Sequence, residues 1–190
     1  MSKLASILKS WLPLAVVVTL VCGIIYVIAQ QVYRNSANDP QIQLAEDTAS
    51  QLEGGLQPSI LITGPPIDMA TSLAPYLIIF NESGTPVVSS GQLDGRIPVP
   101  PPGVFEYSRV NKDDRITWKP RSDVRHAIVI MHYNGSKSGF VLAGRSLRET
   151  EIRIGNLGTG ILIGWLVTLF ASLISVIFME LIINSRRNAT

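Results

Sequence analysis

The sequence predicts an α+β domain, an antiparallel sheet with flanking helices, between two transmembrane helices. Two apolar runs, Leu12–Ala29 and Ile161–Ile183, have about the length that crosses a ~30 Å hydrocarbon core at ~1.5 Å of helix rise per residue. The polar stretch between them contains apolar runs of strand length, separated by Gly, Pro and Asn turn signals. The chain therefore divides into a tail (1–11), a first span (12–33), a domain (34–153), a second span (157–183) and a second tail (184–190).

The first apolar run could instead be the core of a cleaved signal peptide, because Val27-Ile28-Ala29 loosely fits a small-residue cleavage site. Its length exceeds the ~7–15 residues of a signal core, which favours a retained membrane anchor. The lipid bilayer is the first partner that the sequence predicts.

The distribution of basic residues indicates the orientation of the spans. Over wide windows the number of basic residues is the same on the two sides of the spans. The basic residues immediately next to the apolar runs favour a cytoplasmic position for the tails. We therefore expect both termini in the cytoplasm and the domain outside the cell membrane. The basic residues are Lys3, Lys9, Arg186 and Arg187 on the side of the tails, and Arg34, Arg145, Arg148 and Arg153 on the side of the domain.

Composition argues against several classes of function. The net charge is +2, and residues 34–153 contain 12 basic and 13 acidic residues, so we expect no nucleic acid partner. Cys22 is the only cysteine, so neither an intrachain disulfide nor a thiolate metal site can form. The sequence contains no nucleophile elbow, phosphate loop or acid–base constellation, so it predicts no enzyme, no catalytic residue and no cofactor.

Helices are expected at both ends of the domain. Asn38-Asp39-Pro40 is a helix-start signal, and Gly54-Gly55 ends the apolar stripe that follows it. Ile67–Ala74 is expected to be another short helix. Ser146 is expected to cap a last helix, Leu147–Asn156, which runs into the second span.

Five strands are expected between these helices. Tyr76–Phe80 and Pro86–Ser90 form a hairpin around an Asn-Glu-Ser-Gly turn. The proline-rich segment Gly95–Gly103 cannot be an interior strand, so we expect an extended connection there, followed by a short helix, Gly103–Val110. The remaining strands are Arg115–Lys119, Val124–Tyr133 and Gly139–Gly144.

This order of elements resembles the extracytoplasmic PAS-like or single-Cache sensor domains of bacterial two-span membrane receptors. The resemblance lies in Tyr76–Ser90, Ile116–Val129 and Gly139–Glu151, within a match of roughly Asp39 to Glu151. It implies a small-molecule pocket on one sheet face and signal transduction through the second span. Because only residues 184–190 follow that span here, we expect any signal to pass to a separate partner protein.

The candidate ligand-binding residues are Trp118, Arg125, Tyr133 and Arg145. Period 2 places Arg125 and Tyr133 on the same sheet face, and arginine suits carboxylate geometry, so the two could bind an anionic or polar ligand. The alternative is that Arg125 forms an ion pair at a sheet edge and that Tyr133 packs in the core.

His126 and His132 share the opposite face of the strand but lie about 20 Å apart at ~3.3 Å per residue, so no metal site is predicted. Arg145, Arg148 and Arg153 precede the second span, where they can be solvated or bind lipid headgroups.

Gly160, Gly164, Ala171 and Ser175 fall on one stripe of the second span, where small side chains let another helix approach closely. This helix pairing could occur within the chain, in a homodimer or with another membrane protein. Glu180 lies near the end of the span, where it can reach the interface or contact a partner inside the membrane.

Two hypotheses for function remain open. In the first, the chain is a membrane-anchored extracytoplasmic sensor-like module that binds a small molecule and relays to a separate protein. In the second, it is a structural or assembly subunit of a membrane complex and has no ligand of its own. A sheet face filled by side chains would favour the second hypothesis.

Overall fold

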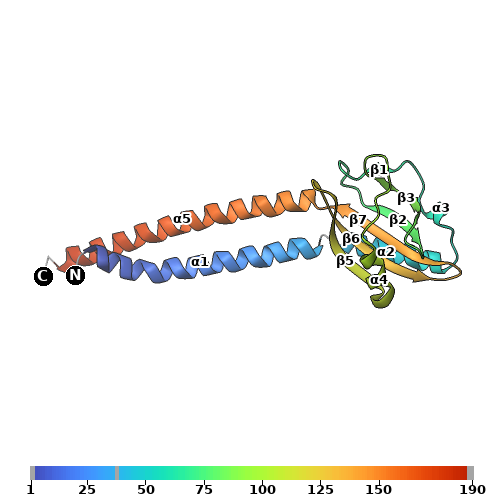
Figure 1. Ribbon diagram of the computed structural model, residues 1–190. Coiled ribbons are helices and arrows are strands. Elements are labelled where there is room, and N and C mark those ends of the chain that lie inside the picture. Colours follow the sequence, from blue (N-terminus) through green and yellow to red (C-terminus); the bar gives the residue numbers. More distant parts are fainter. Residues whose placement is uncertain (1–2, 37–38, 188–190) are drawn as a thin grey trace. The chain divides into compact units, whose positions relative to one another are not determined.

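The computed structural model describes residues 3–36 and 39–187 (Figure 1). Most of helix α1 (Lys3–Ser36) and most of helix α5 (Arg148–Arg187) form one compact unit, and Arg34–Ile152 form the other. The ends of the predicted tails, residues 1–2 and 188–190, lie outside the described residues, as does Asn38 of the predicted helix start.

Helices α1 and α5 are both longer than the predicted spans. They contain 34 and 40 residues, which corresponds to about 51 and 60 Å of helix. Both are long and apolar enough to cross a membrane. Helix α1 already begins at Lys3, because Leu4, Leu8 and their neighbours are good helix formers, and Pro13 therefore lies inside it.

The domain is an α+β structure with a five-stranded antiparallel sheet in the order β3-β2-β7-β6-β5. The predicted hairpin, the later helix and the three later strands are confirmed, each within two residues at its ends. Their observed bounds are β2 (Tyr76–Asn81), β3 (Pro86–Ser89), α4 (Pro102–Asn111), β5 (Asp113–Arg121), β6 (Val124–Asn134) and β7 (Ser138–Ser146).

Helix α2 (Asp39–Glu53) covers one face of the sheet. Its apolar stripe packs on alternate residues of β6 and β7, as the period of two in a strand requires. The helix ends as predicted: Gly55 has φ +92°, and the N–H of Leu56 donates to the Gln51 carbonyl at 3.1 Å. The buried residues of this core are Ala45, Ala49, Leu52, Leu77, Ile79, Val129, Tyr133, Val141 and Ala143.

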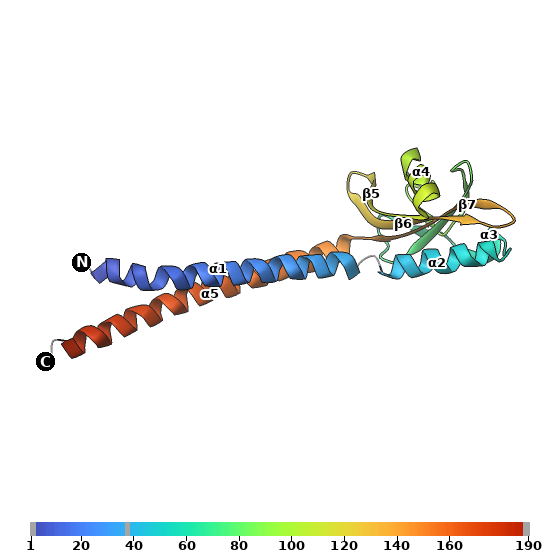
Figure 2. The same ribbon diagram turned by 90° about the horizontal axis from the view of Figure 1, so that it is seen from below.

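Helix α4 lies on the opposite face, so the sheet is covered on both sides (Figure 2). Phe105 from α4 packs edge-on against Phe80 and at a tilt against Phe140, with ring centroids 5.0 Å apart in both pairs. Eight large side chains of this core are at most 1% exposed: Met69, Tyr76, Ile78, Phe80, Ile128, Ile130, Phe140 and Leu142. This face is filled by side chains.

The predicted helix over Ile67–Ala74 is wrong. Ile67–Asp68 is a strand, β1, which pairs in parallel with β4 (Gly91–Gln92). Asp68 then closes a turn, because its carboxylate accepts hydrogen bonds from the Ala70 N–H at 2.9 Å and the Thr71 hydroxyl at 3.1 Å. An aspartate that bonds the backbone two residues on favours a turn over a helix. Helix α3 (Pro58–Leu61), one turn long, precedes β1.

We expect Gly144→Ala to destabilise the domain. A Cβ at this position in β7 would overlap the ring of Tyr76, which is buried in the core on the adjacent strand. Overpacking of this kind costs roughly 1–3 kcal/mol. Thermal unfolding of the full chain in detergent, followed by circular dichroism, should show a lowered Tm. Gly103→Ala is the matched control, because a Cβ there meets nothing within 4 Å, and an unchanged Tm for Gly144→Ala would contradict the packing described.

Candidate functional site

The four candidate ligand-binding residues do not meet at one place. Trp118 is 7% exposed and belongs to the core beneath α4, because β5 pairs it with His126. Tyr133 is 4% exposed and belongs to the core beneath α2. These two rings therefore lie on opposite faces of the sheet, and Arg125 and Arg145 lie elsewhere, near the start of α5.

Arg125 contacts the first turn of α5, whereas Arg145 contacts the turn after β1. The Arg125 guanidinium forms an ion pair with Glu151 of α5 at 2.5 Å. Arg145, near the end of β7, donates from Nε to the Leu73 carbonyl at 3.3 Å. Arg125 therefore forms an ion pair, but on an interior strand of the sheet and with a helix, not at a sheet edge as the alternative interpretation had it. Exposed pairs of this kind are worth only about 0–1 kcal/mol each, so their role is to fix positions.

The connection between β7 and α5 is a single residue, Leu147. Its N–H donates to the Arg125 carbonyl at 2.9 Å, and its own carbonyl accepts from the Glu151 N–H at 2.9 Å. The Ser146 hydroxyl accepts from the Arg148 N–H at 3.3 Å, so it bonds the first residue of α5, which begins one residue later than the predicted Leu147. Arg148 also donates to the Thr71 carbonyl at 2.9 Å. The first turn of α5 is thus bonded to β6, to β7 and to the turn after β1.

A buried polar pair lies in the core close to this junction. His126 is 1% exposed, and its Nδ1 lies 2.9 Å from the Tyr76 hydroxyl. Burial lowers the pKa of His126 below its ordinary value, and a hydrogen bond to the Met69 backbone only partly opposes that effect. Burial also raises the pKa of Tyr76, so both groups are neutral at pH 7. Sequence reasoning placed His126 on the correct face but did not identify its partner.

A second polar cluster, which sequence reasoning missed, lies at the turn between β2 and β3. Glu82 pairs with Arg109 of α4 at 2.9 Å and with His132 of β6 at 3.1 Å. Burial opposes ionisation of Glu82, but hydrogen bonds from Arg109, His132 and Ser138 outweigh it and hold its pKa below the usual range. Because the carboxylate is already satisfied by these donors, the cluster ties elements together and does not offer a free acid or base.

Helices α1 and α5 pair antiparallel through polar contacts along their length. The indole N–H of Trp11 donates to the Ser172 hydroxyl at 3.0 Å, and that of Trp165 donates to the Thr19 hydroxyl at 3.0 Å. Ser6 donates to Glu180, which therefore has a partner within the chain. From Ser6 to Thr19 the residue numbers rise along α1, while those of the partners fall along α5 from Glu180 to Trp165. These contacts therefore fix one antiparallel register.

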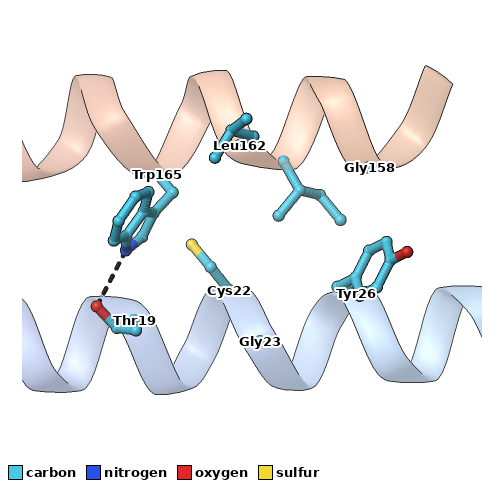
Figure 3. A pocket seen from close by; sticks show the side chains of 8 residues that line it. Thr19, Cys22, Gly23, Tyr26, Gly158, Leu162 and Trp165 are labelled. Carbon is cyan, nitrogen blue, oxygen red and sulfur yellow. Dashed lines mark hydrogen bonds between the residues drawn. The ribbon is translucent and has the colours of Figure 1, made fainter. Parts of the chain in front are cut away.

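A groove of about 450 Å³ lies beside the Trp165–Thr19 hydrogen bond (Figure 3). Glycine makes room for it on both helices, at Gly23 and at Gly158, where the ring of Tyr26 lies 3.3 Å from the place of a Cβ. Its lining is mostly apolar and holds no charged group; the lining residues are Thr19, Cys22, Gly23, Tyr26, Gly158, Ile161, Leu162 and Trp165.

The predicted small-residue stripe of α5 does not face α1. A Cβ at Gly160 or Gly164 would meet nothing within 4 Å, and Ala171 and Ser175 are exposed. At ~100° per residue the stripe lies roughly 120° around α5 from the face that holds Gly158 and Trp165. Within the described residues, α5 pairs with α1 through the face that holds Gly158 and Trp165, and this leaves the stripe open.

Cys22 should form a disulfide with an introduced Leu162→Cys when membranes are treated with a mild oxidant. Both residues line the same groove, and Cys22 is the only native cysteine, so the product reports on α1 and α5 alone. Ile163→Cys, one residue on, is the matched control and should stay reduced, because Ile163 does not line the groove. The readout is faster migration of the monomer on a non-reducing gel. Equal cross-linking of the two variants would contradict the register.

Comparisons with protein-family models, with curated proteins and with solved structures found no match for this chain. We therefore infer its function from the contacts described above.

Proposed function

We propose that this chain is a structural or assembly subunit of a membrane complex, in which α5 docks against a helix of another chain. The observation that carries this proposal is the open stripe of Gly160, Gly164, Ala171 and Ser175. In lipid, helices associate through close packing and interhelical hydrogen bonds, and small residues permit that close approach. Because α1 occupies a different face, the stripe is free to receive a second copy or another membrane protein.

The filled cores of the domain support this function over ligand binding. The face beneath α4 is packed with Phe80, Phe105 and Phe140, and the face beneath α2 with Ile79, Val129 and Val141. Small-molecule sites are cavities of ~300–1,000 Å³ with a few convergent polar groups. The candidate ligand residues are dispersed: Arg125 is bonded to Glu151 of α5, and Arg145 to the Leu73 carbonyl in the turn after β1.

The first turn of α5 connects the domain to the segment of the helix that would bind a partner. The first turn of α5 is bonded to β6 and to the turn after β1, and the helix then continues without a break to Arg187. A partner that binds α5 would therefore be linked to the domain through one continuous helix.

A sensor-like module is a second candidate, and the order of elements favours it. The hairpin, the helix α4 and three further strands between two apolar helices follow the layout on which the resemblance to PAS-like and Cache domains depends. Under that function, a metabolite should raise the Tm of the full chain, since a ligand that binds only the folded state stabilises it. Under the assembly function no such shift is expected.

Gly164→Leu should release the partner of α5. A leucine on the open stripe keeps the two helices apart and removes about 1–2 kcal/mol of packing, a roughly tenfold fall in association. The measurement is chemical cross-linking of the tagged chain in native membranes. Gly155→Leu is the matched control, because a Cβ there also meets nothing within 4 Å but lies on another side of α5. Recovery of the unmutated chain alone, with no cross-linked partner, would count against the proposal.

We further propose that the spans place both termini in the cytoplasm and the domain outside. The tripeptide Asn134-Gly135-Ser136 is an acceptor for N-glycosylation, and Asn134 is exposed at the end of β6. Expressed into microsomes, the chain should gain a glycan that Asn134→Gln lowers in amount, while an acceptor fused behind the C-terminus stays unmodified. Modification of the fused acceptor alone would show the opposite orientation and contradict the proposal.

A further inference from the structure

Strand β5 forms one edge of the five-stranded sheet. It is the last strand in the order β3-β2-β7-β6-β5 and contains nine residues, Asp113–Arg121. The other edge, β3, has four residues and begins with Pro86, so it offers little backbone for pairing. An edge as long as β5 presents a row of backbone donors and acceptors to which another strand can bond.

The pairing of β5 with β6 shows which backbone groups point away from the sheet. The His132 N–H donates to the Lys112 carbonyl at 3.0 Å, and the same antiparallel register continues along β5. Because hydrogen-bonded and non-hydrogen-bonded pairs alternate in such a ladder, the even-numbered residues of β5 bond β6 and the odd-numbered ones point outward. Among the described residues, no other segment forms a backbone hydrogen bond with Asp113, Arg115 or Thr117 on that outer side.

The charges along this outer row fit a second copy of the strand in one register. The odd-numbered positions are Asp113, Arg115, Thr117 and Lys119, of which the last three are exposed. If two β5 strands pair antiparallel about Ile116, Asp113 stands opposite Lys119, and Arg115 opposite Thr117. Centred one residue earlier, two Arg115 side chains oppose each other, and centred one residue later, Arg115 opposes Lys119. Opposite charges stabilise a cross-strand pair and like charges destabilise it, so the register centred on Ile116 is the favoured one of the three.

The other face of the strand provides an apolar contact at the centre of the same register. Ile116 is half-buried and packs against the core beneath α4, to which Trp118 also belongs. In the register centred on Ile116, the two isoleucines form a non-hydrogen-bonded pair, in which opposite side chains approach most closely. Their contact continues the core of one copy into the next.

We propose that β5 pairs with β5 of a second copy of this chain, antiparallel and centred on Ile116, so that the two sheets become one continuous sheet. Charges on an edge strand commonly protect it against pairing. Here the opposite signs of Asp113 and Lys119 select both the partner and the register. The Arg115 Nε binds Oδ2 of Asp113 at 2.7 Å, which leaves Oδ1 to accept from Lys119 of the second copy. This interface lies in the domain and does not depend on what binds the stripe of α5.

Disulfide formation by Ile116→Cys in a Cys22→Ser chain, in membranes treated with a mild oxidant, tests this interface. A covalent dimer should form, because the Cα atoms of the central pair lie about 4.5 Å apart, within reach of a disulfide. Thr117→Cys is the matched control. Its two copies stand on the diagonal, roughly 7–8 Å apart, so its dimer should form about tenfold more slowly.

Charge variants of the Ile116→Cys chain test the register. Lys119→Asp places like charges opposite each other at two symmetric positions and should slow disulfide formation about tenfold. Asp113→Lys should have the same effect. The double variant restores opposite charges between the chains and should restore the rate, although the pair of Asp113 with Arg115 within each chain stays broken. Recovery therefore reports a contact between two chains.

Four results would overturn the proposal: no covalent dimer of Ile116→Cys, equal or faster dimerisation of Thr117→Cys, a disulfide with a protein of another mass, or rates that the charge variants leave unchanged. If Ile116→Cys does not fold, sedimentation of the chain with its native Ile116 decides. Association in detergent should weaken about tenfold in Lys119→Asp and return in the double variant. Pairing through the stripe of α5 alone would not respond to these charges, so failure of this interface is distinguishable from failure of the assembly function.

Discussion

The polar contacts between α1 and α5 are the constraint on which the rest of this protein depends. Inside a bilayer no hydrophobic force holds two apolar helices together, so hydrogen bonds and close packing decide which faces meet. Here two indole N–H groups, from Trp11 and Trp165, bond hydroxyls on the facing helix and fix one register. Because α1 packs on another face of α5, the small-residue stripe of α5 has no partner within the described part of the chain.

The second constraint is the length of the connection between the sheet and α5. With Leu147 alone between β7 and the helix, the first turn of α5 cannot leave the sheet without breaking bonds to β6 and to the turn after β1. The turn after β1 is also held by Arg145, which donates to the Leu73 carbonyl.

Local features of the fold could be predicted from the sequence, whereas its pairings could not. The two faces of β6 and the Gly54-Gly55 helix end can be read within a few residues, and both are confirmed: Ile128 and Ile130 lie in one core, and Val129 and Tyr133 in the other. The face on which Trp118 lies depends on the register between β5 and β6, which no local pattern reveals. Arg145 and Leu73 are likewise 72 positions apart. A short helix was expected over Ile67–Ala74, but the side chain of Asp68 accepts hydrogen bonds that form a turn.

The central claim is that α5 presents one face to α1, a second to another chain and only the remainder to lipid. Spin labels placed singly along residues 158–177 in a Cys22→Ser chain, in native-like membranes, can report the accessibility of each position to dissolved oxygen. Accessibility should be high at Ile163, Phe170 and Ile177 and low both near Trp165 and near Gly164. If the positions around Gly164 prove as accessible to oxygen as Phe170, nothing covers the stripe, and the assembly function is contradicted.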